Sequence, residues 1–393
     1  MPLQPQQDFI RQHLCDDVQE LLLAAHRFPG INMAEAVQQI SGWQTARQKL
    51  PLWAATEGIL YPARISMEQC SSQLTAEYKA SIISSGESMT DLTAGFGVDA
   101  AIMSRKFKHL QCVERDEPLC TLLQNNLPLL TEAAVEVSCG EAELTLGTLP
   151  HQDLIYLDPA RRNRHGNRVV EICECTPDLL LLERQLLEKA DTVLVKLSPM
   201  LNPITISQQL LSVSEVHIVS VDNECKEILA RMQKNAAGVQ FTSVNLKTKG
   251  AAEQLTYTLE SEQQTVCSYA ETLGQYLYEP NASLMKAGCF RTISAAYGID
   301  KLHPNSHLYT SNGHLGQFPG RTFRVIGASS LNKKEAKHLL AGISQANITV
   351  RNFPLSAPEL RKRLKLADGG DHYIFATTMN DGKKCIILAQ KQQ

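Results

Sequence analysis

The sequence predicts an α/β protein with a doubly wound, Rossmann-like sheet, a helical N-terminal domain and a small α+β C-terminal domain. Three observations lead to this prediction. Only helical patterns occur in residues 1–80, strand and helix patterns alternate from about residue 88 to residue 260, and a separate strand–helix pattern occupies residues 321–393. The length of 393 residues also exceeds what one ordinary hydrophobic core supports.

The N-terminal domain is expected to span residues 1–80. Apolar residues recur at helical spacing over 14–26, 33–43 and 72–83, and prolines separate these stretches. The last stretch is expected either to pack against the next domain or to cover its ligand pocket.

Residues 81–274 form the predicted main α/β domain. Eight short apolar runs are expected to be strands, at 89–92, 109–114, 133–138, 153–158, 192–197, 215–221, 241–246 and 255–260. Four stretches between them have helical length and pattern, namely 98–107, 118–130, 177–190 and 223–233. This alternation predicts a mainly parallel sheet whose ligand lies at the carboxyl ends of the strands.

Two smaller modules are expected to follow. Residues 275–320, rich in Gly, Pro, Asn and Tyr, form a linking module with one predicted helix over 282–298. Residues 321–393 read as a βαβαββ unit that carries 13 Lys and Arg but 5 Asp and Glu, so its net charge is +8 and the rest of the chain carries −11. Such asymmetry favours a polyanionic partner, with nucleic acid the commonest, and the alternative is a solvated basic surface.

Composition excludes several classes of protein. With 43% hydrophobic and 20% charged residues, the chain is not disordered. It has no apolar run near the ~18 residues of a membrane helix and no secretory signal pattern, so no membrane association is expected. The eleven cysteines show no paired CxxC spacing, which favours reduced thiols in a cytoplasmic protein and no metal site.

A glycine-rich loop connects the first predicted strand of the main domain to its first helix. Gly95 and Gly97 follow Asp91 at this turn, where backbone N–H groups at a helix start can approach a ligand. The same residues match GxGxxA, the dinucleotide fingerprint, and Glu114 ends the second strand, where a carboxylate accepts ribose hydroxyls. Asp91, four residues before Gly95, favours a ligand with a cationic amine, such as S-adenosyl-L-methionine, and the alternative is an aspartate that caps the helix.

The third and fourth strands end in Cys-Gly-Glu141-Ala142 and in Leu-Asp158-Pro159-Ala. Taken in order, the motifs DLTAGFG, VE, GEAE and LDPA resemble class I S-adenosylmethionine-dependent methyltransferases over roughly residues 70–260. The tail, with VRNFPLSAPELRKRLKLADGGDHYIFATT, resembles the THUMP-like domain of a bacterial methyltransferase family in which a small ferredoxin-like module precedes it.

The resemblance implies roles for individual residues. Asp91 and the glycine-rich loop would hold the methionine end of the cofactor, and Glu114 would accept its ribose hydroxyls. Glu141 and Ala142 would border its adenine. The full set of implied cofactor residues is Asp91, Thr93, Ala94, Gly95, Gly97, Glu114, Glu141 and Ala142. Asp158 and Pro159 fall where nucleic-acid amino-methyltransferases orient an exocyclic amine, and are the implied catalytic residues. Ala160 and Arg161 depart from that pattern, where a second proline and a stacking aromatic residue are usual.

Basic residues near the expected cofactor and in the tail are the candidate RNA contacts: Arg161, Arg162, Arg164, Lys196, Arg361, Lys362, Arg363 and Lys365. The alternatives are a solvated cluster paired with nearby acids and, for Lys196, a lysine that extends to solvent from a strand end.

These features together predict a cytoplasmic methyltransferase that uses S-adenosyl-L-methionine and acts on an rRNA or tRNA base. Two alternatives of other classes remain. One is an RNA-binding protein of the same fold whose altered 158–161 motif no longer supports catalysis. The other is a nicotinamide-dependent oxidoreductase based on the GxGxxA pattern. Methylation of a protein or a small molecule also stays open.

Overall fold

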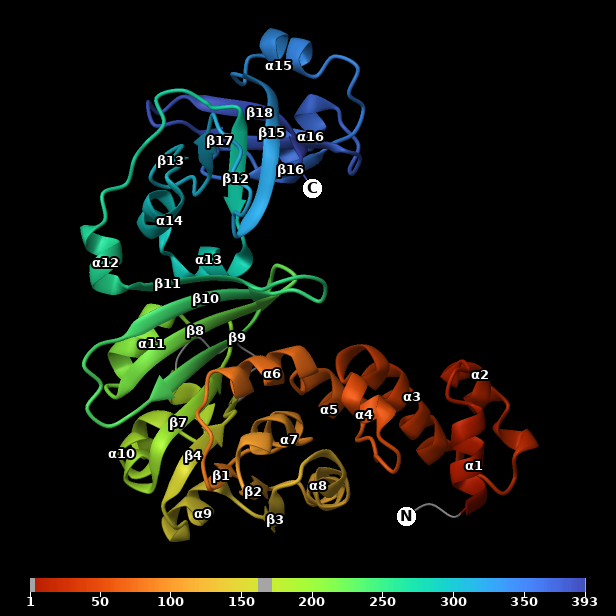
Figure 1. The fold of residues 1–393 in the computed structure, drawn as a ribbon. Coiled ribbons are helices and arrows are strands. Elements are labelled where there is room, and N and C mark those ends of the chain that lie inside the picture. The colour runs from red at the N-terminus through yellow and green to blue at the C-terminus, as the bar shows by residue number, and fades with distance from the viewer. Residues whose placement is uncertain (1–3, 162–171, 393) are drawn as a thin grey trace. The chain divides into compact units, whose positions relative to one another are not determined.

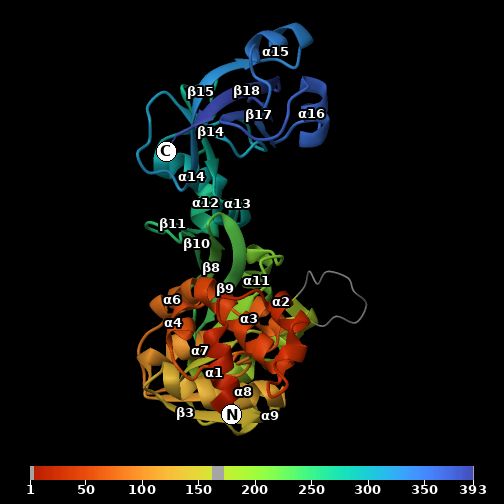
Figure 2. The same cartoon turned by 90° about the vertical axis from the view of Figure 1, so that its right-hand side faces the viewer.

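The computed structural model describes residues 4–161 and 172–392 of the chain, shown from two sides in Figures 1 and 2. The chain divides into two compact units. The first comprises Met1–Ser214 with Ile228–Gly238, and the second comprises Glu215–Glu227 with Val239–Gln393. Among the residues described, none of the helices is both long and apolar enough to cross a membrane.

The N-terminal region is helical, as predicted. Its α-helices are α1 (Gln4–Gln12), α2 (Val18–Leu23), α3 (Met33–Lys49), α4 (Pro51–Ala55), α5 (Arg64–Gln69) and α6 (Gln73–Ser81). Asp17, Asn32 and Ser72 cap α2, α3 and α6 by accepting hydrogen bonds from the first-turn N–H groups. Asn126 joins this region to α8 (Glu117–Leu130) through two hydrogen bonds with the backbone of Leu60.

A nine-stranded sheet forms the main α/β architecture. Its order is β11-β10-β8-β9-β7-β4-β1-β2-β3. The strands are β1 (Ser88–Asp91), β2 (His109–Glu114), β3 (Ala134–Cys139), β4 (Gln152–Leu157), β7 (Ala190–Leu197), β8 (Val213–Val221), β9 (Glu224–Met232), β10 (Gln240–Leu246) and β11 (Glu253–Thr258). The central pairs β7–β4, β4–β1, β1–β2 and β2–β3 are parallel, which places the carboxyl ends of these strands at one edge.

Helices cover the sheet on both faces. Figure 1 shows α7 (Val98–Met103), α8 and the N-terminal helices on one side, while α9 (Ala142–Thr148) and α10 (Leu179–Lys189) lie on the other. The structure thus confirms the predicted doubly wound α/β fold. Within residues 81–274 it adds three short helices that the sequence pattern did not indicate, α9, α11 (Pro203–Gln209) and α12 (Leu259–Gln264).

One predicted helix of the main domain is wrong. Most of the stretch 223–233 forms β9 (Glu224–Met232), which runs antiparallel to β7. Asp222 and Asn223 adopt positive φ angles of 46° and 69° between β8 and β9, the conformation of a tight hairpin turn. The Glu and Lys residues at the start of the segment have a helix propensity, but burial outweighs it because Ile228, Leu229 and Ala230 are fully buried in the sheet.

The C-terminal part contains a seven-stranded sheet of order β13-β14-β12-β15-β18-β17-β16. The strands are β12 (Tyr276–Pro280), β13 (Asp300–Lys301), β14 (Tyr309–Ser311), β15 (Gly320–Ser329), β16 (Asn347–Val350), β17 (His372–Thr378) and β18 (Lys384–Lys391). The helices are α12 (Leu259–Gln264), α13 (Ala282–Ala287), α14 (Phe290–Tyr297), α15 (Lys333–Leu339) and α16 (Ala357–Leu364).

The strand–helix order predicted for residues 321–393 appears in this sheet, and β15 pairs with both β12 and β18. The single helix expected over 282–298 is instead two helices, because Gly288 adopts a positive φ of 75° and ends α13.

Candidate active site

A cavity of about 340 Å³ opens at the carboxyl ends of β1, β2 and β4. It is lined by all eight residues that the sequence singled out for the cofactor: Asp91, Thr93, Ala94, Gly95, Gly97, Glu114, Glu141 and Ala142. Asp158 lines the same cavity, whereas buried Pro159 is not among the lining residues. The fold therefore collects residues that are up to 67 positions apart in the chain at one site.

The glycine-rich loop has a backbone that requires glycine. Gly95 and Gly97 have φ angles of 55° and 81°, in the left-handed region. A Cβ atom on Gly97 would also lie 2.5 Å from Leu123 Cδ2 of α8. The loop thus passes close to α8 and turns directly into α7, and its residues from Thr93 to Gly97 line the cavity.

Glu114, at the end of β2, holds this loop in place. Its Oε2 accepts a hydrogen bond from Gly95 N at 2.8 Å, and its Oε1 accepts bonds from Arg115 N and Asp116 N at 2.9 and 3.0 Å. These bonds fix the carboxylate at the cavity wall, where its remaining lone pairs are acceptors for ligand hydroxyl groups.

Asp91, at the end of β1, is almost completely buried, with an exposed fraction of 1%. Its Oδ1 accepts a hydrogen bond from Thr93 N at 2.9 Å, so a local cap-like bond exists. Burial raises the pKa of Asp91 well above its usual range, and the nearby carboxylates of Asp99, Asp158 and Glu114 add to this effect. A buried carboxylate of this kind favours a ligand that brings a positive charge to it.

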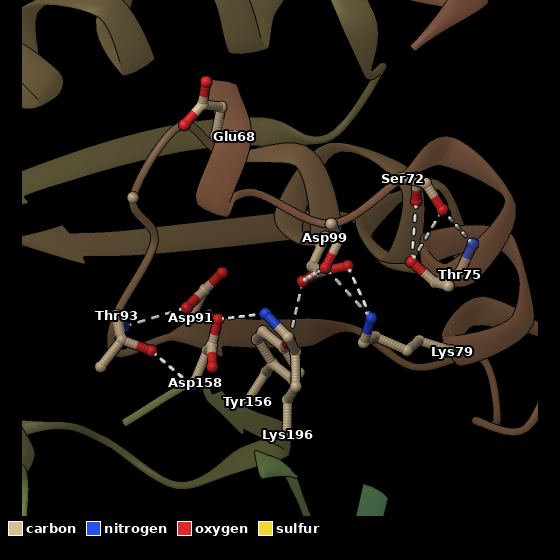
Figure 3. A network of polar contacts seen from close by, with 12 residues as sticks. Glu68, Ser72, Thr75, Lys79, Asp91, Thr93, Asp99, Tyr156, Asp158 and Lys196 are labelled. Carbon is tan, nitrogen blue, oxygen red and sulfur yellow. Dashed lines mark hydrogen bonds and ion pairs between the residues drawn. The ribbon is translucent and has the colours of Figure 1, made fainter. Parts of the chain in front are cut away.

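Asp158 follows β4 directly and is held by contacts on two sides. Its backbone N donates to Thr93 Oγ1 at 2.6 Å, and its Oδ2 forms an ion pair with Lys196 Nζ (Figure 3). Lys196 comes from β7, the neighbour of β4, and its side chain is 15% exposed. The lysine thus contacts the candidate catalytic residue and does not simply extend to solvent.

A second buried network adjoins the cavity, and the sequence analysis missed it. Asp99 in α7 lies 3.1 Å from Lys79 Nζ of α6 and accepts hydrogen bonds from Ser71 Oγ at 2.7 Å and Tyr156 Oη at 2.8 Å (Figure 3). Burial alone would raise the pKa of Asp99, but Lys79 and then Lys196 hold it below its usual range. A single aspartate at the second position of the predicted helix 98–107 gave no sequence signal for this role.

Helix α5 and the residues that follow it before α6 form one wall of the cavity. Ser66, Gln69, Cys70 and Ser71 line it, while α6 itself packs against α7 through Lys79. Residues 72–83 were expected either to pack against the next domain or to cover its ligand pocket. Helix α6 packs, and the residues just before it line the pocket. The sequence signal that locates this wall is the Ser72 cap, whose Oγ accepts a bond from Thr75 N.

The candidate RNA contacts are only partly described. Arg161 lies in β5 (Ala160–Arg161), which pairs with β6 (Cys175–Thr176). The side chain of Arg161, together with Arg162 and Arg164, lies outside the described residues. In α16, Arg361 donates to the carbonyl oxygens of Ala346 and Ala367, each at 3.1 Å, and pairs with Asp368.

Arg361 therefore fixes the end of its helix, whereas Lys362, Arg363 and Lys365 are exposed. Within residues 4–161 and 172–392, no group of three His, Cys, Asp or Glu side chains is placed to hold a metal ion.

Comparisons with known proteins agree with this architecture. A ferredoxin-like domain model matches residues 276–319, and a THUMP domain-like model matches residues 320–391. The crystal structure of a "putative methyltransferase" from Porphyromonas gingivalis W83 is 36% identical, covers 98% of this chain and 97% of its own, and superposes with a TM-score of 0.87. An uncharacterised S-adenosylmethionine-dependent methyltransferase of Mycobacterium tuberculosis (strains CDC 1551 and H37Rv) is 21% identical over 329 residues, which is 82% of this chain and 86% of that protein.

Proposed function

Because the chain belongs to the family of S-adenosylmethionine-dependent methyltransferases that includes the Porphyromonas gingivalis protein, we propose that its methyl acceptor is RNA. The family makes this protein an enzyme that uses S-adenosylmethionine, so the nicotinamide-dependent and non-catalytic alternatives are set aside. The observation that carries the RNA proposal is the THUMP-like module, whose residues 321–393 have a net charge of +8.

The cavity at β1, β2 and β4 fits this cofactor. Asp91 would pair with its ammonium group, the backbone of the loop from Thr93 to Gly97 would border its methionine portion, and Glu114 would accept its ribose hydroxyls. Glu141 and Ala142, at the start of α9, would border the adenine. When bound, the cofactor supplies a methyl group on a sulfonium, which is already activated for transfer.

Asp158 is proposed to orient the acceptor. Its Oδ2 is engaged by Lys196, which leaves Oδ1 to accept a hydrogen bond from an exocyclic amine of a base. The carbonyl oxygen of Pro159 would take a second bond from the same amine. Two acceptors fixed in direction would align the nitrogen lone pair with the methyl group, and in-line positioning is the main requirement of this transfer.

RNA capture is proposed to involve the exposed cations at the end of α16, namely Lys362 and Arg363 in its last turn and Lys365 just after it. Arg161, Arg162, Arg164 and Lys196 are proposed to act nearer the reacting base. Contacts with phosphates position a nucleic acid without reading its sequence, so these residues would set affinity and not base choice.

The direct test of the RNA proposal is methyl transfer from labelled S-adenosylmethionine. Total RNA from cells that lack the gene should accept label, whereas RNA from cells that express it should accept much less because its sites are already modified. Labelled nucleosides, separated after digestion, would identify the product. Label that appears only in protein or small molecules would replace RNA as the acceptor.

Cofactor binding should depend on pH through Asp91. The raised pKa keeps this carboxyl protonated to a higher pH than a solvated aspartic acid, and a cationic ligand prefers its ionised form. Affinity should therefore rise by up to about tenfold per pH unit as the pH approaches that pKa from below, and level off above it. Titration calorimetry in two buffers of different ionisation enthalpy should detect release of a proton on binding.

Asp91→Asn should bind more weakly and lose both the pH dependence and the proton release. Glu136→Gln, which changes an exposed carboxylate on β3, is the matched control and should keep them. Equal pH profiles for the Asp91→Asn variant and the unchanged protein would show that another group binds the ammonium.

A further inference from the structure

A second cavity, of about 1020 Å³, lies within the second unit, beside β12, β15 and the β8–β9 turn. Its lining includes the aromatic rings of Tyr297 and His314, the cations Arg321 and Lys391, amides such as Asn223 and Gln317, and two carboxylates. Its size is at the upper end of the range for small-ligand pockets. No role in the transfer reaction accounts for it.

The loop of residues 313–320, which borders this cavity, is anchored by hydrogen bonds at both ends. Tyr278 Oη donates to Gly313 O at 3.0 Å and accepts from Leu315 N at 3.1 Å. At the other end, Asn281 N donates to Pro319 O at 3.1 Å, and a Cβ atom on Gly320 would lie 2.2 Å from Glu279 O. The residues between these anchors, including exposed Gln317, are therefore presented to the cavity in a fixed position.

The charges around the cavity favour an anion. Glu279, which is 4% exposed, holds Arg321 through Nε at 2.8 Å and Nη2, and also pairs with Arg351. One carboxylate thus fixes two guanidinium groups, and Arg321 keeps its Nη1 donors for a ligand. Lys391, at the end of β18, is exposed and has no ion-pair partner among the residues that the structure describes.

The acidic groups at the cavity are already used by the protein. Asp222 accepts hydrogen bonds from Thr248 N at 3.2 Å and Thr248 Oγ1 at 2.8 Å. Glu253 pairs with Lys247 and accepts bonds from the amides of Asn245 and Asn281, both at 3.0 Å. A cationic ligand would have to displace these bonds, whereas an anionic ligand meets Lys391 and Arg321.

The aromatic side chains supply a surface for stacking. His314 is exposed, and its ring meets Tyr276 edge-on with centroids 5.1 Å apart, which holds the ring while leaving a face open. Tyr297 is half-buried and is fixed by an edge contact with Phe318 at 5.5 Å. Unstacked bases of single-stranded RNA bind to such rings, and a regular duplex hides its base faces.

We propose that this cavity binds an unpaired nucleotide of the substrate RNA, with its base stacked on His314 and its phosphate between Arg321 and Lys391. The inference rests on the proposed RNA substrate and adds a place where a single-stranded segment is bound. Amide side chains such as Gln317 can both donate to and accept from the edge of the base. The cavity would then contribute affinity for unpaired RNA and none for a blunt duplex.

Binding of a labelled, mixed-sequence single-stranded oligoribonucleotide of about 10 nucleotides tests this directly. His314→Ala in the full chain should weaken binding by roughly 5- to 150-fold, the range for loss of one base–aromatic stack. Lys391→Gln should weaken it and reduce its salt dependence. Lys383→Gln, which removes an exposed lysine of the same module outside the cavity, should change affinity by less than about twofold.

The variants must also keep the melting temperature of the unchanged protein, and photocrosslinking of a thiouridine-labelled RNA should mark the peptide that contains His314. Unchanged affinity in both His314→Ala and Lys391→Gln would overturn the proposal, as would equal competition by a blunt RNA duplex. Binding of adenosine monophosphate as tight as that of the oligonucleotide would also overturn it, because the cavity would then serve a free nucleotide.

Failure of the proposed function gives a different result. If labelled methyl groups never enter RNA but the oligonucleotide binds and His314→Ala weakens it, RNA is not the methyl acceptor and the binding site stands. If RNA is methylated and neither His314→Ala nor Lys391→Gln weakens RNA binding or raises KM, RNA is the methyl acceptor and the proposed nucleotide site is wrong.

Discussion

Asp158→Asn is expected to slow methyl transfer at least ~100-fold, within the range for groups that act directly on a reacting amine or its proton. The carboxylate lies at the cavity that also contains Asp91 and Glu114, and Thr93 and Lys196 hold it from two sides. An asparagine keeps the shape of the side chain but has one acceptor oxygen in place of two, so Lys196 and the acceptor amine would compete for it, and the amide nitrogen cannot accept a hydrogen bond from either. Cofactor affinity and melting temperature should stay nearly unchanged.

The alternative role for Asp158 is a turn cap, which predicts the opposite pattern. Asp158→Ala would then cost about 0.5–2 kcal/mol of stability and preserve the activity per folded molecule. Asp178 is a matched control, because it caps α10 by accepting a bond from Leu180 N and does not line the cavity. Single-turnover rates and thermal melts on Asp158→Asn, Asp158→Ala and Asp178→Ala separate the two roles. A destabilised but active Asp158→Ala protein would end the catalytic assignment.

The parts of the fold that could be predicted from the sequence are those in which local pattern and burial agree. The helix over 118–130 has its apolar face and its Asp116 cap in the sequence, and the structure contains both. The helix predicted for residues 223–233 is wrong because their Glu, Lys and Ala residues favour a helix locally, whereas the hairpin turn at Asp222 and Asn223 places the following residues in the sheet.

The same distinction applies to the site. Asp91, Gly95 and Glu114 could be located because parallel strands put their carboxyl ends at one edge, so a motif after each strand has a known place. Asp99 and Lys79 could not, since the pair joins two helices that are neighbours only in the folded chain. A lone Asp and a lone Lys at helical positions look like ordinary surface residues until the packing of α6 on α7 is known.

Lys79→Met is expected to lower the free energy of unfolding of the first unit by about 3–5 kcal/mol, the usual cost of removing one partner of a buried ion pair. Lys79 is fully buried, its Nζ lies 3.1 Å from Asp99 Oδ1, and it donates to Ser71 Oγ at 3.2 Å. Methionine fills similar space without the charge, so the main loss is that Asp99 is left ionised in a buried site. Urea unfolding followed by tryptophan fluorescence reports on this unit, because Trp43 and Trp53, the only two tryptophans, lie in α3 and α4.

The pH dependence of this loss distinguishes an ion pair from simple packing. In the unchanged protein the folded-state pKa of Asp99 is lowered, so the pair's stabilisation is present above the unfolded aspartate pKa of about 4 and is lost as the pH falls below it. In Lys79→Met the pKa of Asp99 should rise, and protonation should relieve the buried charge as the pH falls. The stability difference between the two proteins should therefore shrink from pH 7 to pH 4. Lys79→Met with Asp99→Asn should recover much of the loss at pH 7, and a pH-independent difference that the double variant does not recover would assign the effect to packing.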